Sequence, residues 1–207
     1  YLQDLLKAEG VVCGYNYSFG RMGAGKAEDL KTLGKEYGFQ CRLVPQVSWK
    51  GRQVSSTEIR RLVEEGRMLG GQMMLGHPRL YAGKVVGGNH LGSRMGFPTA
   101  NIEIPEGLVW PAYGVYAAYL ATEDGRIMEA ILNAGIRPTV TSDQAVPSFE
   151  AHILNYSGNL YGRKLRLVLS QQLRRERPFG SVEELFAQVS KDKKKVGPAL
   201  TDLRAAL

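Results

Sequence analysis

The sequence of 207 residues has few cysteines and lacks long apolar runs. The two cysteines, Cys13 and Cys41, form no C-x-x-C pair and no spacing with histidine, which excludes a disulfide framework and a zinc site. We therefore expect two buried, reduced thiols. No apolar run reaches the length of about 18 residues that a membrane helix needs, and a basic start followed by an apolar secretory stretch is also missing. These absences predict a cytoplasmic protein.

Positive charge exceeds negative charge, and the excess lies near the C-terminus. The net charge is +7 and the pI about 9.4. Residues 160–207 hold 11 Lys or Arg against 5 Asp or Glu, a surplus of 6. Such an excess suits a nucleic-acid partner, a polyanionic small substrate such as ATP, or solubility alone. Because Lys193, Lys194 and Lys195 are consecutive with no aromatic residue among them, we expect a solvated helix face, without a nucleic-acid or membrane partner.

Length and composition predict a folded protein with two domains. Apolar residues make up 43% and charged residues 23%, as in ordinary globular domains, so disordered and fibrous classes are excluded. The chain is long enough for two modest domains, each with its own core. We place the boundary between residues 72 and 73, with Gly70 and Gly71 at the joint.

Residues 1–72 alternate between helix and strand signals, which predicts a parallel α/β layer. The expected elements are a strand at Val11–Gly14, a glycine-rich loop at Gly20–Gly25, a helix at Glu28–Tyr37 and a strand at Cys41–Val47. Another helix follows the N-cap candidates Ser55, Ser56 and Thr57 and ends at Gly66.

After Leu75 the pattern changes to short β-rich segments separated by glycine and proline. The expected strands are Tyr81–Val86, Val115–Ala121, Ile127–Leu132, Phe149–Asn155 and Leu165–Leu173. The turn at residues 123–125 joins two of them as a hairpin. A helix capped by Ser181 follows, because apolar residues recur there at helical spacing. The segment therefore predicts an antiparallel barrel or sandwich with a helix packed against it.

Residues 20–27 nearly match the phosphate-binding loop G-x-x-x-x-G-K-[ST] and follow a predicted strand. That motif needs a hydroxyl after the lysine to hold Mg²⁺, and Ala27 has none. We therefore reject this motif. A phosphate-binding or mobile loop of another family and a structural glycine turn both remain open.

The segment from Gly83 to Asn101 is the most informative in the chain. Its five glycines permit tight turns and allow backbone N–H groups to face an anion, as in phosphate-binding loops. They are Gly83, Gly87, Gly88, Gly92 and Gly96. His90 and Arg94 lie among them. Pro98 keeps the residue before it extended.

Thr99 and Asn101 are two residues apart, so on a strand both side chains lie on one face. A hydroxyl beside an amide oxygen suits Mg²⁺, which takes oxygen ligands and shares them with substrate phosphates. Composition alone would favour a turn here over a strand.

Glu150 stands in a strand whose alternate residues are apolar. Phe149, Ala151 and Ile153 fall on one face, and Glu150 and His152 on the other. A carboxylate at such a position is either a solvent-facing residue or a catalytic base.

Taken in order, these segments resemble the bacterial bifunctional riboflavin kinase/FMN adenylyltransferase (FAD synthetase) family. The resemblance rests on Gly96-Phe-Pro-Thr-Ala-Asn101, Pro111-Ala-Tyr-Gly-Val-Tyr116, Asn133-Ala-Gly-Ile-Arg-Pro-Thr139, Phe149-Glu-Ala-His-Ile-Leu154, Gly158-Asn-Leu-Tyr-Gly162, and Leu173-Arg-Arg-Glu176 with Phe179 and Ser181. It implies a small Greek-key β-barrel with a C-terminal helix over residues 73–207, unrelated to P-loop kinases.

The resemblance also implies a riboflavin kinase that uses ATP and Mg²⁺ to convert riboflavin to FMN. Glu150 would be the base and would deprotonate the ribityl 5′-hydroxyl, while Thr99 and Asn101 would bind the metal. The residues implied for ATP and its phosphates are Gly83, Lys84, Gly87, Gly88, His90, Gly92, Arg94, Gly96, Pro98 and Thr99. Those implied for the flavin are Asn133, Gly135, Arg137, Thr139 and Arg174. One departure is that Ser93 follows Gly92, so that the arginine of the family pattern comes one position later, as Arg94.

Residues 11–26 and 54–62 resemble the later part of the adenylyltransferase domain, which makes residues 1–72 a partial Rossmann-like nucleotidyltransferase. Ser55, Ser56, Thr57 and Arg60 match its signature. The H-x-G-H motif of that family should lie upstream of Tyr1. We therefore expect this chain to be a piece of a longer protein and not to make FAD itself, although its parent would. Two alternatives to a kinase remain: a nucleotidyltransferase alone, and a non-catalytic β-barrel that binds flavin or nucleic acid.

Overall fold

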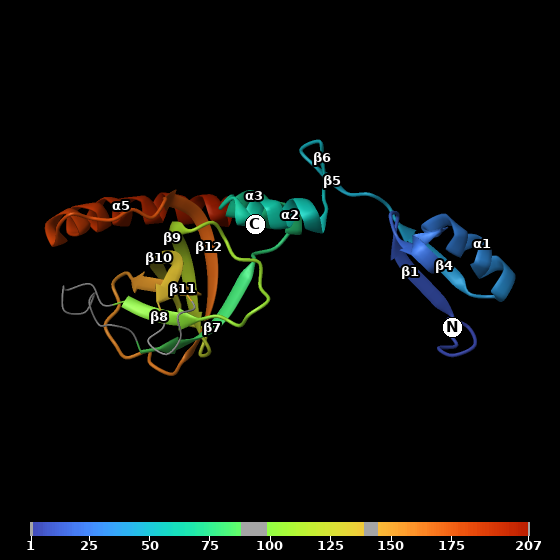
Figure 1. The fold of residues 1–207 in the computed structure, drawn as a ribbon, viewed down its shortest axis with the longest axis horizontal. Coiled ribbons are helices and arrows are strands. Elements are labelled where there is room, and N and C mark those ends of the chain that lie inside the picture. Colours follow the sequence, from blue (N-terminus) through green and yellow to red (C-terminus); the bar gives the residue numbers. More distant parts are fainter. Residues whose placement is uncertain (1, 88–98, 139–144, 207) are drawn as a thin grey trace. The chain divides into compact units, whose positions relative to one another are not determined.

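The computed structural model describes residues 2–87, 99–138 and 145–206. The chain forms two compact units, Tyr1–Val54 and Ser55–Leu207 (Figure 1). The division lies upstream of the expected boundary at 72/73. The reason is that the two helices after Val54 pack on the barrel.

The first unit is built around two parallel strands and one helix. Its elements are β1 (Gly10–Gly14), β2 (Ser18–Phe19), the 3₁₀ helix η1 (Arg21–Gly23), β3 (Gly25–Lys26), α1 (Ala27–Tyr37), β4 (Gln40–Val44), β5 (Ser48–Trp49) and β6 (Arg52–Gln53). Strands β1 and β4 pair in parallel, with α1 in the connection between them. This is the expected partial α/β layer. The predicted strand to Val47 was too long, because Pro45 follows the last residue of β4 and has no N–H for the ladder.

One face of the β1/β4 pair is half-buried and the other exposed. Cys13 and Cys41 lie on the half-buried face and are free thiols. They were expected to be buried, but two strands and one helix provide too little cover.

The second unit begins with two helices, α2 (Ser56–Glu64) and α3 (Met68–Leu75). Ser55 is the N-cap of α2, as predicted, and its side chain accepts a hydrogen bond from the Glu58 amide. Gly66, with φ of 76°, follows the end of α2 as expected. The predicted joint at Gly70 and Gly71 was wrong, because both lie inside α3. Without side chains they let α3 pack closely on α2, where Gly71 faces Val63.

Six antiparallel strands then close into a barrel. They are β7 (Leu80–Val86), β8 (Thr99–Glu103), β9 (Gly114–Thr122), β10 (Ile127–Pro138), β11 (Ala145–Ile153) and β12 (Lys164–Arg174). Their order around the barrel is β10-β11-β8-β7-β12-β9. Strands β9, β10 and β11 are consecutive neighbours, and β12 returns to lie beside β9. This arrangement is a Greek key, and it confirms the predicted fold.

The predicted bounds of β7, β9 and β12 were right to within one residue at each end, whereas those of β10 and β11 were not. Strand β10 continues past Leu132 to Pro138, and β11 runs from Ala145 to Ile153 rather than from Phe149 to Asn155. Asn155 has a φ of 52°, a left-handed conformation outside the β region, which ends the regular strand before it.

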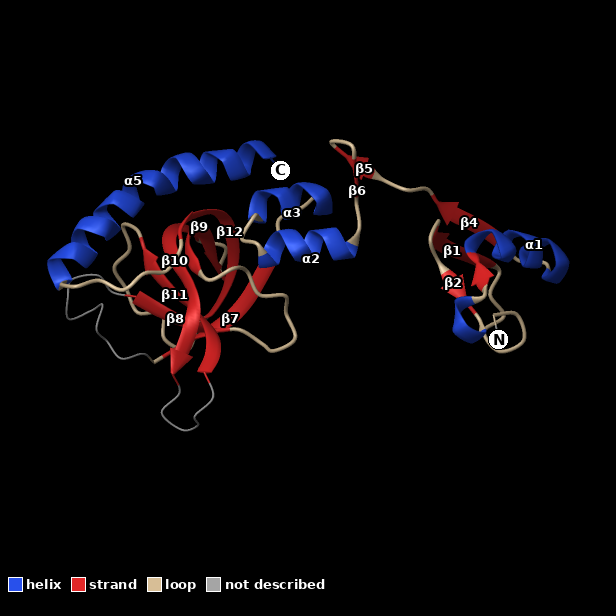
Figure 2. Cartoon of the chain, turned by 45° about the horizontal axis from the view of Figure 1, so that its top comes forward, coloured by secondary structure: helices blue, strands red, loops and turns tan. Residues whose placement is uncertain are grey.

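Helix α5 (Val182–Ala206) lies along the outside of the barrel (Figure 2). Its residues Val196 and Leu200 pack on Val115 and Ile131 of the outer barrel wall, while Tyr116 and other side chains fill the interior. Ser181 accepts a hydrogen bond from the Glu184 amide, as a capping residue does. Pro198 interrupts the hydrogen-bond ladder inside α5, and the helix curves around the barrel.

Candidate active site

Residues far apart in the sequence form one row across the outer barrel wall. Arg174 of β12 is opposite Val115 of β9, which is opposite Asn133 of β10. Asn133 is in turn opposite Glu150 of β11, and Glu150 is opposite Asn101 of β8. Because directly opposite residues have neighbouring side chains on one face of a sheet, the register alone brings four of the predicted site residues together.

Alternation along β11 decides which side chains reach this row. Phe149 and Ala151 have no exposed surface and fill the barrel interior, whereas Glu150 is exposed on the outside. The predicted two-face pattern of this strand is confirmed. The same alternation directs Thr99 and Asn101 outward, because Ala100 and Ile102 lie in the barrel core.

Thr99 and Glu150 contact each other directly. The Thr99 hydroxyl donates to Glu150 Oε1 at 2.6 Å. A threonine hydroxyl has one proton and two lone pairs. Since its proton faces the carboxylate, its lone pairs remain available for a cation.

Thr99 and Asn101 fit the requirements of Mg²⁺. Both offer oxygen ligands on one strand face, beside the carboxylate of Glu150. Within the described ranges, no three His, Cys, Asp or Glu side chains gather where they could hold a metal ion by themselves. A cation here would therefore complete its ligand shell with phosphate and water, as Mg²⁺ commonly does.

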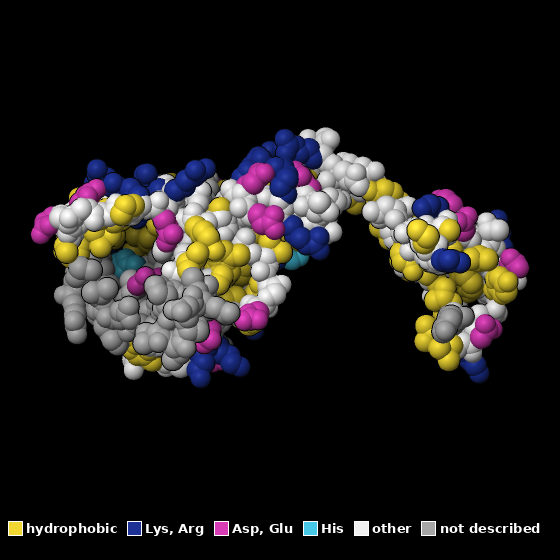
Figure 3. Space-filling view, viewed as in Figure 1, with side chains coloured by type: hydrophobic (Ala, Val, Ile, Leu, Met, Phe, Trp, Pro, Cys, Tyr) yellow, Lys and Arg dark blue, Asp and Glu magenta, His cyan; other side chains and the backbone are white. Residues whose placement is uncertain are grey.

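A cavity of about 680 Å³ lies over the row, between the barrel wall and α5. Thr99, Asn133, Glu150 and Arg174 line it together. Its remaining lining residues are Val115, Ile131, His152, Glu176, Arg177, Pro178, Phe179, Leu185, Phe186, Val189 and Asp192. Figure 3 shows hydrophobic side chains gathered beneath the terminal helix, beside a histidine. The cavity thus has a mainly apolar roof, from Phe179 and α5, and a floor on which polar side chains stand beside Val115 and Ile131, so that it can contact both apolar and polar parts of a ligand.

Arg174 is held at this cavity by a buried carboxylate. Its Nε donates to Asp192 Oδ2 at 2.8 Å, and Asp192 has no exposed surface. The second oxygen of Asp192 accepts from Gln188 Nε2 at 2.8 Å. The Arg174 guanidinium also lies 5.4 Å from the ring centre of Phe179, a cation–π contact. These contacts fix the guanidinium beside the cavity.

The loop between β12 and α5 is fastened by a second ion pair. Arg177 Nη1 lies 2.8 Å from Glu184 Oε1, and the Gly180 amide donates to Glu184 Oε2 at 2.9 Å. This backbone hydrogen bond, together with the positive charge of Arg177, lowers the pKa of Glu184. Arg177 also stacks on Phe179, at 4.6 Å. The aromatic edge of the cavity is thus tied to the first turn of α5.

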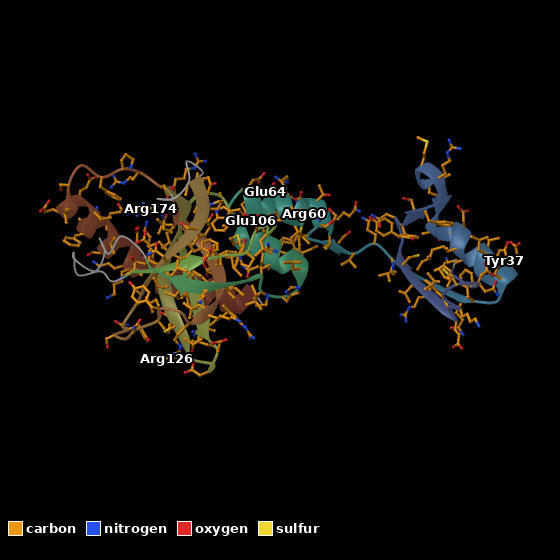
Figure 4. All side chains as sticks on the ribbon, turned by 60° about the horizontal axis from the view of Figure 1, so that its bottom comes forward. Tyr37, Arg60, Glu64, Glu106, Arg126 and Arg174 are labelled. Carbon is orange, nitrogen blue, oxygen red and sulfur yellow. The ribbon has the colours of Figure 1, made fainter. Side chains whose placement is uncertain are left out.

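A second cavity, of about 410 Å³, meets the first at Thr99. Besides Thr99 it is lined by Val85, Ala100, Ala151, Ile153, Tyr156, Ser157, Gly158, Asn159, Leu160 and Tyr161. Arg126 lies over the Tyr156 ring at 5.0 Å, and Figure 4 shows Arg174 at the upper edge and Arg126 at the lower edge of the barrel. Two ligands could therefore approach Thr99 and Glu150 from different sides.

Other predicted residues lie elsewhere. Gly83 and Lys84 line a separate cavity of about 530 Å³ with Glu103 and Lys164. A Cβ on Gly83 would be 2.3 Å from the Glu103 carbonyl oxygen, so close strand packing alone requires glycine there. Gly87 has open space around it. Gly88, His90, Gly92, Arg94, Gly96, Pro98 and Thr139 lie outside the described residues, as does the side chain of Arg137. Ser55, Ser56, Thr57 and Arg60 surround the start of α2.

Sequence reasoning assigned no role to Asp192 or Glu176. Asp192 stands between Lys191 and Lys193 and looks like part of a solvated face. Its position four residues after Gln188, on the side of α5 that carries Val189 and Val196, was the available signal. Glu176 carried no periodic signal, and the available signal was its place in the Leu173–Glu176 segment that resembles the family.

None of the helices in the described part of the chain is long and apolar enough to cross a membrane.

A closed Greek-key barrel with a polar site on its outer wall, roofed by a C-terminal helix, defines a flavokinase-type barrel. The chain belongs to the riboflavin kinase family, whose model matches residues 75–200. The FAD synthetase model matches residues 1–58.

The chain is also similar to curated bifunctional riboflavin kinase/FMN adenylyltransferases. The protein of Escherichia coli K12 is 35% identical over 83% of this chain and 55% of its own length. That of Listeria monocytogenes is 35% identical over 90% of this chain and 59% of its own. That of Bacillus subtilis is 28% identical over 96% of this chain and 63% of its own. The chain thus spans little more than half the length of these relatives.

A solved structure described as a macrolide-efflux protein from Streptococcus pneumoniae has the same fold. Its TM-score is 0.82 at 29% identity, and the match covers 92% of this chain and 60% of that one.

Proposed function

We propose that this chain transfers the γ-phosphoryl group of ATP to the 5′-hydroxyl of riboflavin, giving FMN and ADP. The observation that carries the proposal is the Thr99–Glu150 hydrogen bond at the junction of two cavities. A hydroxyl acceptor and a phosphoryl donor must meet in line. They can meet at this junction, where the carboxylate of Glu150 and the metal-binding hydroxyl of Thr99 lie side by side.

The larger cavity is assigned to riboflavin. The isoalloxazine ring would pack against the apolar roof from Phe179 and α5, with Arg174 at its edge. The ribityl chain would then extend along the polar floor toward Glu150. The smaller cavity, with Tyr156 and Tyr161 in its lining, is assigned to the nucleotide base.

Glu150 would act as the general base. It accepts the proton of the 5′-hydroxyl while that oxygen bonds to the γ-phosphorus, and the bond from phosphorus to the bridging oxygen of ADP breaks. Thr99 and Asn101 would hold Mg²⁺ together with the phosphates. Bound Mg²⁺ would supply charge neutralisation at the phosphate oxygens. Thr99 would additionally keep the Glu150 carboxylate oriented through their hydrogen bond.

The same proposal includes the small-molecule partners, the cellular location and the role of the first unit. The small-molecule partners would be riboflavin, ATP, FMN and ADP, and the location the cytoplasm. We further propose that the first unit is part of an FMN adenylyltransferase domain, so that FAD synthesis belongs to longer proteins of this kind. Ser55 is already engaged as the cap of α2, which leaves Ser56, Thr57 and Arg60 free to contact phosphate there.

The direct test is to incubate the purified chain with riboflavin, ATP and Mg²⁺ and to separate flavins and nucleotides by chromatography. We expect FMN and ADP in equal amounts. Riboflavin binding without ADP formation by the folded protein would instead identify a flavin-binding module.

A further inference from the structure

The amide of Asn133 is held by Glu176 at the larger cavity. Asn133 Nδ2 donates to Glu176 Oε1 at 2.6 Å, although the two residues are 43 positions apart. Both line the cavity. Glu176 is exposed and lies just beyond β12, so its side chain crosses from the loop to the neighbouring wall.

The charge of Glu176 fixes which end of the amide faces it. A carboxylate only accepts hydrogen bonds, so it selects the NH₂ end of the asparagine and excludes the oxygen end. Asn133 Oδ1 is then turned away from Glu176. That oxygen is buried and has no hydrogen-bond partner among the described residues. Such an acceptor is unfavourable unless a donor reaches it when the site is filled.

Gly135 makes the contact possible. A Cβ built on this residue would lie 2.5 Å from Glu176 Oε1 and 3.1 Å from Asn133 Nδ2. Any larger residue would displace the carboxylate. The glycine thus provides space for Glu176.

Asn133 is a cross-strand neighbour of the proposed base, Glu150. Asn133 is directly opposite Glu150 on the neighbouring strand, so their Cβ atoms are about 5 Å apart. Neighbouring hydroxyls of a polyol lie one carbon–carbon bond apart. A chain whose terminal hydroxyl reaches Glu150 can therefore offer its next hydroxyl to Asn133.

We propose that Glu176 is a positioning residue that orients Asn133 Oδ1 to accept a hydrogen bond from the hydroxyl next to the one that is phosphorylated. The inference rests on the proposed function, because it takes the ribityl chain as the ligand of the polar floor. It adds a source of specificity, because Asn133 would accept a hydrogen bond from the 4′-hydroxyl while Glu150 accepts the proton of the 5′-hydroxyl.

The test compares riboflavin with 4′-deoxyriboflavin, which lacks the hydroxyl in question. The parental chain is expected to favour riboflavin in kcat/KM by about 3- to 10-fold, the range of one hydrogen bond. In Glu176→Ala this preference should disappear, because kcat/KM for riboflavin falls while kcat/KM for 4′-deoxyriboflavin stays at the parental value. Glu176→Gln should recover part of it, because its amide oxygen can still accept from Asn133. Glu106→Ala, an exposed glutamate that lines the separate 530 Å³ cavity, should behave as the parent.

Affinities of both flavins for each variant, from flavin fluorescence, keep the inference separate from catalysis. If the folded parent binds riboflavin more tightly than the deoxy analogue but makes no FMN, the proposed kinase activity fails and the positioning role can still be read from binding. A preference that persists unchanged in Glu176→Ala would overturn the positioning role while leaving the kinase intact. Equal binding and turnover of the two flavins by the parent would overturn it as well.

Discussion

Thr99 and Glu150 are 51 residues apart in the sequence, and in the fold the hydroxyl of one donates to the carboxylate of the other at 2.6 Å. The contact is diagonal, because Thr99 lies directly opposite His152 while Glu150 lies opposite Asn101. One hydrogen bond thus joins the group assigned to the metal and the group assigned to the proton. The two roles are therefore coupled. Substitutions of Glu150 should affect proton transfer, and substitutions of Thr99 and Asn101 should affect metal binding.

Replacing Glu150 by glutamine should remove proton transfer and retain binding. Glutamine keeps the size and polarity of the side chain but accepts no proton at neutral pH. We expect kcat to fall by about 10² to 10⁴, with a much smaller change in the dissociation constant of riboflavin. Steady-state kinetics with a binding titration check this, and Glu103→Gln, another exposed glutamate of the barrel, serves as control. A Glu150→Gln variant with parental kcat would make Glu150 a solvent-facing residue.

Substitutions of Thr99 and Asn101 should weaken nucleotide binding more than flavin binding. Thr99→Val and Asn101→Ala each remove an oxygen ligand, and we expect affinity for Mg²⁺-ADP to fall by about 10- to 100-fold. Thr99→Ser keeps the hydroxyl and should stay near the parent. Calorimetric titration with ADP and Mg²⁺, next to riboflavin titrations, measures both affinities. Unchanged nucleotide affinity in Thr99→Val and Asn101→Ala would contradict the metal assignment.

Most of the longer elements of this fold could be predicted, because their signals are local, but helix α3 could not. The alternation of Phe149, Glu150 and Ala151 gave the strand and its two faces, and Ser181 gave the start of α5. Gly70 and Gly71 misled for a physical reason. A glycine pair commonly marks a joint because glycine is flexible. Here the two glycines lie inside α3, and their small size allows this helix to pack closely on α2.

The arrangement of the site could not be predicted from local signals. Which residue of β10 lies opposite Glu150 depends on strand register between distant segments, and a slip by one residue would place Asn133 in the core. The family resemblance predicted which residues form the site, but only the strand register of the structure shows that they lie in one row across the barrel wall. Asp192 was missed because it stands among lysines in the sequence, a pattern typical of an exposed helix face, whereas in the fold it lies on the buried side of α5.

Breaking the Arg174–Asp192 pair should destabilise the second unit. Asp192 has no exposed surface and accepts hydrogen bonds at both oxygens. Asp192→Ala leaves the guanidinium of Arg174, whose side chain is 18% exposed, without its partner. Loss of one member of a fully buried pair costs about 3 to 5 kcal/mol, and because solvent reaches part of Arg174 we expect the lower end of this range. Urea unfolding measures the free energy. Asp202→Asn, an exposed aspartate on the same helix, is the control, expected within about 0.5 kcal/mol of the parent. A loss of similar size in both variants would show that Asp192 has no special role.

The first turn of α5 should loosen in acid because of Glu184. Its pKa is lowered by the Gly180 amide and by Arg177, so its carboxylate stabilises the folded turn when ionised. For a group with a lowered pKa in the folded state, this contribution is present above its unfolded pKa and is lost as pH falls through the folded value. We therefore expect the amide protection factors of Gly180, Glu184 and Leu185, whose N–H groups donate hydrogen bonds at this turn, to decrease between about pH 5 and pH 3. In Glu184→Gln the protection at pH 6 should already be reduced, and its decrease over this range should be smaller. Mass spectrometry of hydrogen exchange, corrected for intrinsic rates, gives both quantities. An identical pH dependence in the parent and in Glu184→Gln would assign the effect to other groups.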